Sequence, residues 1–95
     1  MKANLIELTR LERYLKDHGY KYERKDEEVN EFMNRHQIVV MNDKGEYMWD
    51  AICHFGSYGY EQGLLEIAGD IVTGDYAVEG FLTAKDVIDR LKGVA

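Results

Sequence analysis

Cys53 and the histidines are the side chains of this sequence that could act as a nucleophile and its base. A cysteine attacks as its thiolate, and a neighbouring imidazole can accept the thiol proton. His54 follows Cys53 directly, but neighbours on a strand point to opposite faces, so His36 across a hairpin is the better partner. Cysteine is also a common core residue. We therefore expect Cys53 in the core and predict no catalytic residue. A small enzyme or ligand-binding protein with a cleft near His54, His36 or Cys53 is the alternative.

The histidine spacing does not favour a metal site. His18, His36 and His54 are eighteen residues apart each time, whereas zinc ligands usually occur in pairs about two to five residues apart. A site formed by His36, Asp50 and His54 is disfavoured, because the expected hairpin places His36 and Asp50 on opposite faces. The sequence therefore predicts no metal and no cofactor.

A segment rich in glycine and aromatic residues runs from His54 to Tyr60, with Gly56 and Gly59 on either side of Ser57 and Tyr58. It lacks the lysine of a phosphate-binding loop and the glycine spacing of a dinucleotide site. Glycines permit sharp turns, and aromatic side chains on such a loop either cover the core or project as anchors for a partner.

Aromatic residues are dense around this loop. The chain has eleven Phe, Trp and Tyr residues, and five of them lie between positions 47 and 60. A small core is expected to leave some of these rings exposed, and aromatic residues are enriched at protein interfaces. We predict a non-enzymatic interaction module that binds a protein partner or a second copy of itself; a purely structural homodimer is a further alternative. The candidate binding residues are Trp49, His54, Phe55, Tyr58 and Tyr60.

The elements that must position these residues begin with a helix and end with one. Four leucines at helical spacing predict a first helix that ends at Gly19. Thr83 with Asp86 has the spacing of a capping box and predicts the start of the last helix. A strand fits residues 20–24, and residues 26–34 are either a short helix capped by Asp26 or a loop. The leucines are Leu5, Leu8, Leu11 and Leu15.

The clearest strand signal is a hairpin over residues 36–53, with turn residues at 42–45. Pairing Met41 with Glu46 places Ile38 opposite Trp49 and Val40 opposite Tyr47 on one face. Residues 64–72 then follow helical spacing and predict a further helix, despite two glycines. The expectation is one α+β domain over residues 1–95. Its three-stranded antiparallel sheet is packed by the N- and C-terminal helices, in the order helix, strand, short helix or loop, two strands, two helices.

Composition restricts the function classes. The net charge is −6, and residues 26–95 carry five basic and fourteen acidic side chains, so nucleic-acid binding is not expected. A single cysteine cannot form an internal disulfide. No apolar run is long enough for a membrane span, and residues 1–5 lack the apolar region of a secretion signal. These features predict a cytoplasmic protein; no motif specifies a small-molecule ligand.

Two segments carry a resemblance. The string WDAICHFGSYGYEQGLLE over residues 49–66, together with VEGFLTAKDVI over residues 78–88, resembles short uncharacterised proteins encoded by phages and prophages of Gram-positive bacteria. The likeness covers about half of the chain, from residue 49 to residue 91. It implies a protein of mobile-element origin in a bacterial cytoplasm. It favours binding over catalysis and implies no functional residue.

Overall fold

The computed structural model describes residues 3–93, so the first two residues of the N-terminal segment discussed above lie outside it. The fold is α+β, with five strands that pair antiparallel with their neighbours in chain order. No helix formed by residues 3–93 has the length and apolar character needed to cross a membrane. The elements are α1 (Ile6–Asp17), β1 (Lys21–Asn30), β2 (Met33–Met41), β3 (Tyr47–Ile52), the short 3₁₀ helix η1 (Tyr60–Gln62), β4 (Leu65–Gly69), β5 (Val78–Leu82) and α2 (Ala84–Leu91).

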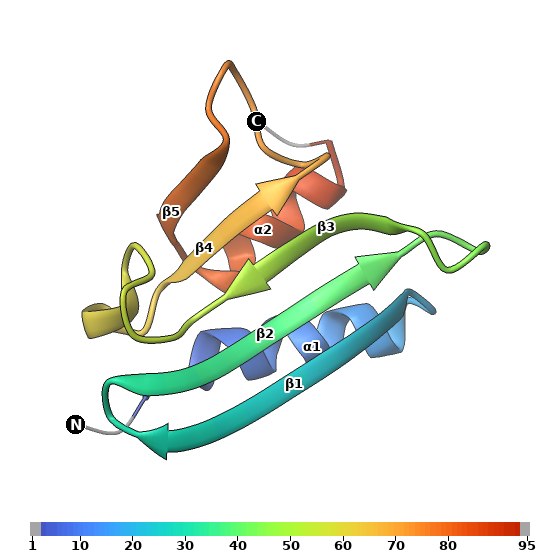
Figure 1. Cartoon of the computed structure of the whole chain (residues 1–95). Coiled ribbons are helices and arrows are strands. Elements are labelled where there is room, and N and C mark those ends of the chain that lie inside the picture. Colours follow the sequence, from blue (N-terminus) through green and yellow to red (C-terminus); the bar gives the residue numbers. More distant parts are fainter. Residues whose placement is uncertain (1–2, 94–95) are drawn as a thin grey trace.

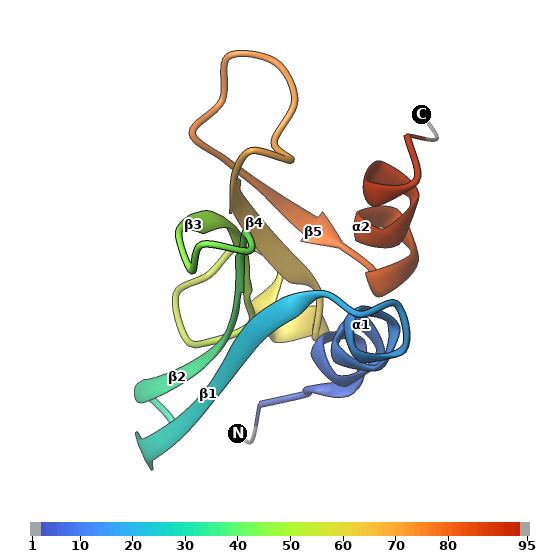
Figure 2. The same cartoon turned by 90° about the vertical axis from the view of Figure 1, so that its right-hand side faces the viewer.

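Both α-helices pack on the same face of the sheet, as Figure 2 shows, and neither covers the opposite face. The core lies between the helices and the sheet, because each element buries only its apolar stripe or face. The buried apolar side chains are Leu8, Leu11, Leu15, Ile38, Val40, Trp49, Ala51, Cys53, Tyr60, Leu65, Ile67, Ala84 and Val87.

The two α-helices start and pack as their sequences predict. Leu8, Leu11 and Leu15 are fully buried along one stripe of α1. At the start of α2, the Thr83 hydroxyl accepts a hydrogen bond from the Asp86 N–H (3.1 Å), and the Asp86 carboxylate accepts one from the Thr83 N–H (2.9 Å). This reciprocal arrangement satisfies two N–H groups that the helix leaves without partners.

The predicted three-stranded sheet is wrong, because the sheet also contains β4 and β5, which the sequence did not predict. Residues 26–34 also differ from the short helix or loop predicted for them, since they form the end of β1, a two-residue turn and the start of β2. β1 continues to Asn30, and β2 begins at Met33. Residues 25–30 are all exposed, so they show none of the apolar alternation that marks a strand. Their pairing with β2 defines the strand instead, and Asp26 lies directly opposite His36.

The helix predicted over residues 64–72 is also wrong, because this segment contains strand β4. Leu65 and Ile67 are buried on the core face, while Glu66 and Ala68 point to the other face. Gly69 has a φ of +98°, and a Cβ there would lie 2.5 Å from the Met48 carbonyl oxygen. This close approach of the β3 and β4 backbones requires glycine at position 69. The run is a strand because it pairs with β3 on one side and β5 on the other.

The predicted hairpin exists, but its register is shifted. Met41 pairs with Tyr47, Val40 with Trp49 and Ile38 with Ala51, and a bulge lies between Val40 and Met41. The bulge turns Tyr47 away from the core, so that its hydroxyl donates to Asp50 on the uncovered face. Trp49 consequently packs in the core, with 2% of its surface exposed.

Candidate binding surface

Four exposed aromatic side chains gather at one end of the sheet. Phe32 is in the β1–β2 turn, Phe55 and Tyr58 are in the segment between β3 and β4, and Phe81 is in β5. Their exposed fractions are 64%, 50%, 59% and 58%. Figure 1 shows the β1–β2 turn and the segment that carries η1 at the same end of the molecule. We call these four residues the aromatic end.

The rings of the aromatic end contact one another and one buried ring. Phe32 and Phe55 meet edge to face, with centroids 5.2 Å apart. Phe55 meets the buried Tyr60 in the same way at 6.2 Å, and Tyr58 lies 6.4 Å from Phe81. Edge-to-face and tilted arrangements are those that aromatic pairs prefer. The rings thus form two groups, one around Phe55 and one of Tyr58 with Phe81. Residues of both groups, Phe55, Tyr58, Tyr60 and Phe81, line one shallow hollow, so the groups share one surface.

Asn34 of β2 forms hydrogen bonds with the segment between β3 and β4. Its carbonyl oxygen accepts a hydrogen bond from the Phe55 N–H (2.8 Å), and its amide donates to the Tyr60 hydroxyl (3.3 Å). Tyr60 is 6% exposed and forms the floor of the patch. A side chain that satisfies both a backbone and a hydroxyl group holds the loop in one position.

Gly80 allows the other half of the loop to lie directly on β5. A Cβ at Gly80 would lie 2.3 Å from the Cβ of Tyr58, a separation that real side chains do not reach. The Tyr58 N–H donates to the Glu66 carboxylate (2.9 Å), and the Tyr58 carbonyl accepts from the Phe81 N–H (3.3 Å). The exposed Tyr58 ring is therefore carried by an anchored backbone.

Phe81 has an unusual backbone conformation. Its φ is +58°, and it is the only residue other than glycine with a positive φ among residues 3–93. A bulge between Leu65 and Ile67 accompanies it in the β4–β5 pairing. Bulges re-aim side chains, and this one turns Phe81 to solvent. Such a conformation costs about 1 kcal/mol for a bulky residue and often marks a functional position.

The structure separates the residues that the sequence nominated for binding. Phe55 and Tyr58 are exposed and belong to the patch, whereas Trp49 and Tyr60 are buried and offer almost no surface. His54 is half-buried, and its Nδ1 atom has no hydrogen-bond partner among residues 3–93. Burial lowers the pKa of His54 despite the nearby Glu66 carboxylate, so its ring is neutral near pH 7.

Sequence reasoning missed Phe32 and Phe81. Phe32 falls in the segment interpreted as a short helix or loop, and Phe81 falls in a segment for which no strand was predicted. The signal for Phe32 was its position after Asn30, whose side chain accepts the Phe32 N–H (2.8 Å) as in a tight turn. No local signal identifies Phe81, because its orientation depends on the bulge.

Two side chains of the alternative site, His36 and Cys53, are buried and contact other groups of the chain. His36 is 3% exposed, and its ring nitrogens lie 2.7 Å from Asp26 and 3.1 Å from Glu28. The Cys53 thiol is also buried, contacts the Asn4 carbonyl oxygen (3.5 Å) and has its pKa raised by burial. A raised pKa opposes formation of the Cys53 thiolate. Both ring nitrogens of His36 already contact carboxylates, so His36 is not free to accept the thiol proton.

The contacts of Asp26 with His36 and Arg24 change the pKa of its carboxyl group. Partial burial alone would raise the pKa of Asp26, but hydrogen bonds with His36 and Arg24 outweigh burial and lower it. Asp26 therefore stays ionised beside the imidazole and joins β1 to β2. Among residues 3–93, no group of three or more His, Cys, Asp or Glu side chains is arranged to hold a metal ion.

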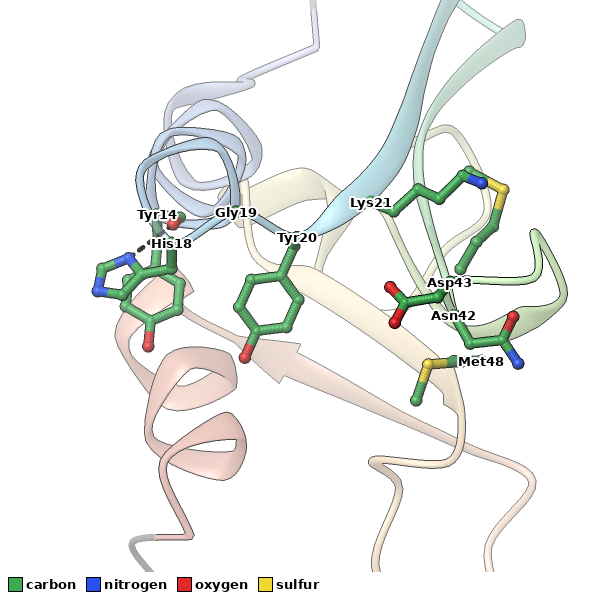
Figure 3. Close-up of a pocket in the computed structure, with 9 residues that line it drawn as sticks. Tyr14, His18, Gly19, Tyr20, Lys21, Asn42, Asp43 and Met48 are labelled. Carbon is green, nitrogen blue, oxygen red and sulfur yellow. Dashed lines mark hydrogen bonds between the residues drawn. The ribbon is translucent and has the colours of Figure 1, made fainter.

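A shallow hollow of about 540 Å³ lies at the other end of the sheet, where α1 ends and β2 turns into β3. Figure 3 shows Tyr14 stacked on His18 at its edge and the Tyr20 ring projecting between α1 and Met48. The centroids of the stacked rings are 3.9 Å apart. His36, Cys53 and His54 do not line this hollow. Its aromatic rings are half-buried or paired within the chain.

Comparison with known proteins adds no relative to this geometry. No protein-family model matches the chain, and searches of curated proteins and of solved structures give no significant match. The aromatic end is the most distinctive feature of the surface described above.

Proposed function

We propose that this protein is a non-enzymatic interaction module that binds a protein partner through the aromatic end. The observation that carries the proposal is that three separate segments bring together two pairs of aromatic rings, Phe32 with Phe55 and Tyr58 with Phe81, each ring at least half exposed. Phe55, Tyr58 and Phe81 line one hollow between the pairs. Removing apolar surface from water favours association. Large rings on a fixed backbone also lose little conformational entropy when they bind.

The unusual φ of Phe81 supports the same surface. A folded chain gains stability by avoiding such a conformation, for example with glycine or asparagine at that position. Phe81 instead presents a large ring to solvent beside Tyr58. A binding role explains why an aromatic side chain occupies a position that disfavours it.

Charge around the aromatic end indicates the chemistry of the partner. A small hollow of about 60 Å³ lies between Phe32, Phe55 and Tyr60, and Glu31 and Glu61 flank it. An aliphatic side chain with a cationic head fits such a site, because its stem contacts the rings while its charge approaches the carboxylates. The partner surface that we propose is therefore apolar at its centre and basic at its rim, which also fits the net charge of −6.

We keep a mobile-element origin as part of this proposal, on the resemblance of residues 49–91 to phage and prophage proteins. Under that origin the partner is a protein of the same bacterial cell. The alternative site near His36, Cys53 and His54 receives no support from the contacts described above.

Site-specific photo-crosslinking in bacterial cells tests the surface directly. A photoreactive amino acid replaces Phe55 or Tyr58 in two variants, and Tyr76 in a third. Tyr76 is a matched control because it is 76% exposed on the β4–β5 loop, away from the aromatic end. The same crosslinked protein should appear from positions 55 and 58 and be absent from position 76.

Measuring the affinity for the crosslinked protein then shows whether Phe55 and Tyr58 contribute to binding or only lie close to the partner. Phe55→Ala with Tyr58→Ala should weaken binding at least about tenfold, since exposed aromatic anchors are typical hot spots. Tyr76→Ala should leave affinity unchanged. Equal crosslinking from all three positions, or unchanged affinity of the double variant, would exclude the aromatic end as the binding surface.

A further inference from the structure

Strand β1 is a free edge of the sheet. It is ten residues long and pairs only with β2, because the strand order begins with β1. Figure 1 shows no other element running along its outer side. The outward N–H and C=O groups of an edge strand remain available to another strand. β1 is the longest of the five strands and one of the two edge strands of the sheet.

The face of β1 that points away from the helices carries charges of alternating sign. Lys21, Glu23, Lys25 and Glu27 follow one another on this face, and all four are exposed. None of them forms an ion pair or a side-chain hydrogen bond with another residue in the described range 3–93. Within β2, only Glu27 has a charged residue directly opposite it, Arg35, while Lys21, Glu23 and Lys25 face uncharged residues. The strand thus offers a regular charge pattern in which no ion pair is formed by residues 3–93.

We propose that β1 pairs antiparallel with β1 of a second copy of this chain, about a two-fold axis at Arg24. Because the second β1 runs in the opposite direction, each lysine of one copy lies opposite a glutamate of the other. Lys21 faces Glu27 of the second copy and Glu23 faces Lys25, and the two-fold axis repeats both contacts. Directly opposed side chains of opposite charge stabilise antiparallel pairs.

The same pattern specifies the register. Moving the axis by one residue, to Glu23 or Lys25, shifts the pairing by two positions. Glu23 then faces Glu23 of the second copy, or Lys25 faces Lys25, and every remaining contact within the four charges joins like charges. An axis at Tyr22 or Asp26 again opposes unlike charges, but it gives two such contacts, whereas the axis at Arg24 gives four. The pattern therefore favours the axis at Arg24, while the same charges disfavour the pairing of unrelated strands.

The helix-facing side of β1 is compatible with this axis. Arg24 lies on it and would meet Arg24 of the second copy, but its guanidinium is already neutralised within its own chain. It donates to Asp26 (2.9 Å) and to Glu12 of α1 (3.0 Å), and 14% of its side chain is exposed. Each Arg24 carries two carboxylate partners of its own chain, and these negative charges offset the repulsion between the two guanidinium groups.

The pairing also leaves the proposed partner surface free. In an antiparallel arrangement the β1–β2 turns of the two copies point in opposite directions, and Phe32 lies in that turn. Each dimer therefore presents two aromatic ends, one at each end of the joined sheet. A partner with two binding sites would gain affinity from this geometry without any new contact.

Charge reversal at two neighbouring positions tests the pairing. Lys25→Glu places glutamate opposite Glu23 of the second copy, and Glu23→Lys places lysine opposite Lys25. Each variant alone should dimerise at least about tenfold more weakly than the original chain. An equimolar mixture of the two should regain dimerisation, because each variant then meets its opposite charge. Lys44→Glu, in the β2–β3 turn, is the matched control.

Sedimentation equilibrium at low salt, over about 10 μM to 1 mM protein, measures these constants. The original chain and the Lys44→Glu variant should dimerise and should dissociate as salt rises to about 0.5 M. Circular dichroism checks that each variant is folded, which the exposure of both side chains predicts. A monomer throughout, unweakened single variants, or a mixture that stays monomeric would each overturn the proposal. These outcomes concern β1 alone and leave the crosslinking test of the aromatic end unaffected.

Discussion

The two ends of the sheet use aromatic side chains in opposite ways. At the hollow where α1 ends, Tyr14 stacks on His18, lies near Tyr20 and has the Lys92 ammonium 5.8 Å from its ring centroid. These tyrosines are half-buried and engaged on several sides. At the aromatic end, the outer rings contact mainly one another and stay at least half exposed. Ring number alone therefore does not indicate a binding surface.

The comparison shows what does indicate one. At the hollow, the chain supplies the partners of its own rings. At the aromatic end it supplies a rigid support, formed by Tyr60, Asn34 and Gly80, and leaves the outer faces of the rings open. An exposed apolar surface on a fixed backbone is typical of an interaction site.

Replacing Tyr60 by alanine should have the largest effect on stability. Tyr60 is the buried floor of the aromatic end, so Tyr60→Ala should lower the free energy of unfolding by about 3–5 kcal/mol, as for other large core truncations. Tyr58→Ala removes an exposed ring of similar size and should lower it by less than about 1 kcal/mol. Urea unfolding measures both.

Tyr60→Phe is the matched control, because it keeps the ring and removes only the hydrogen bond with Asn34, at a cost of about 1 kcal/mol. A cost for Tyr58→Ala as large as that for Tyr60→Ala would show that Tyr58 covers the core, and the contrast between exposed rim and buried floor would be lost.

Local signals made part of this fold predictable from sequence. The leucine stripe of α1 and the capping box of α2 are fixed by residues within a few positions of one another, and both are confirmed. The β2–β3 hairpin is confirmed as well, although the bulge beside Met41 shifts its register. A bulge adds one residue to one strand and leaves no mark in an alternating pattern.

Long-range contacts decided the parts that could not be predicted. The polar half of β1 is a strand because β2 pairs with it and His36 binds Asp26, contacts that join residues far apart in the chain. The apolar run that forms β4 fits both helical and strand spacing, and its pairing with β3 and β5, distant in the chain, decides for the strand. Similarly, composition indicated Phe55 and Tyr58, but only the strand order brings Phe32 and Phe81 beside them.

Tyr14→Ala should sharpen the comparison between the two ends. The variant loses the stack on His18 and the contact with Lys92, and we expect the free energy of unfolding to fall by about 1–2 kcal/mol. Affinity for the crosslinked partner should be unchanged. Tyr58→Ala should show the reverse pattern, with stability nearly kept and affinity lost. If both variants affect the same quantity, the two ends do not differ in role.

Phe81→Asn should give the smallest change in stability and is the most informative about strain. Asparagine tolerates a φ near +58° better than phenylalanine, so relief of the backbone offsets the loss of the contact with Tyr58. We expect thermal unfolding to show a change within about 0.5 kcal/mol, of either sign, while affinity for the partner falls. The double substitution with Tyr58→Ala should weaken binding less than the two single effects combined, because the two rings contact each other. A clear loss of stability in Phe81→Asn would instead mean that the ring holds β5 on the sheet, and the strain at this position would then reflect folding and not recognition.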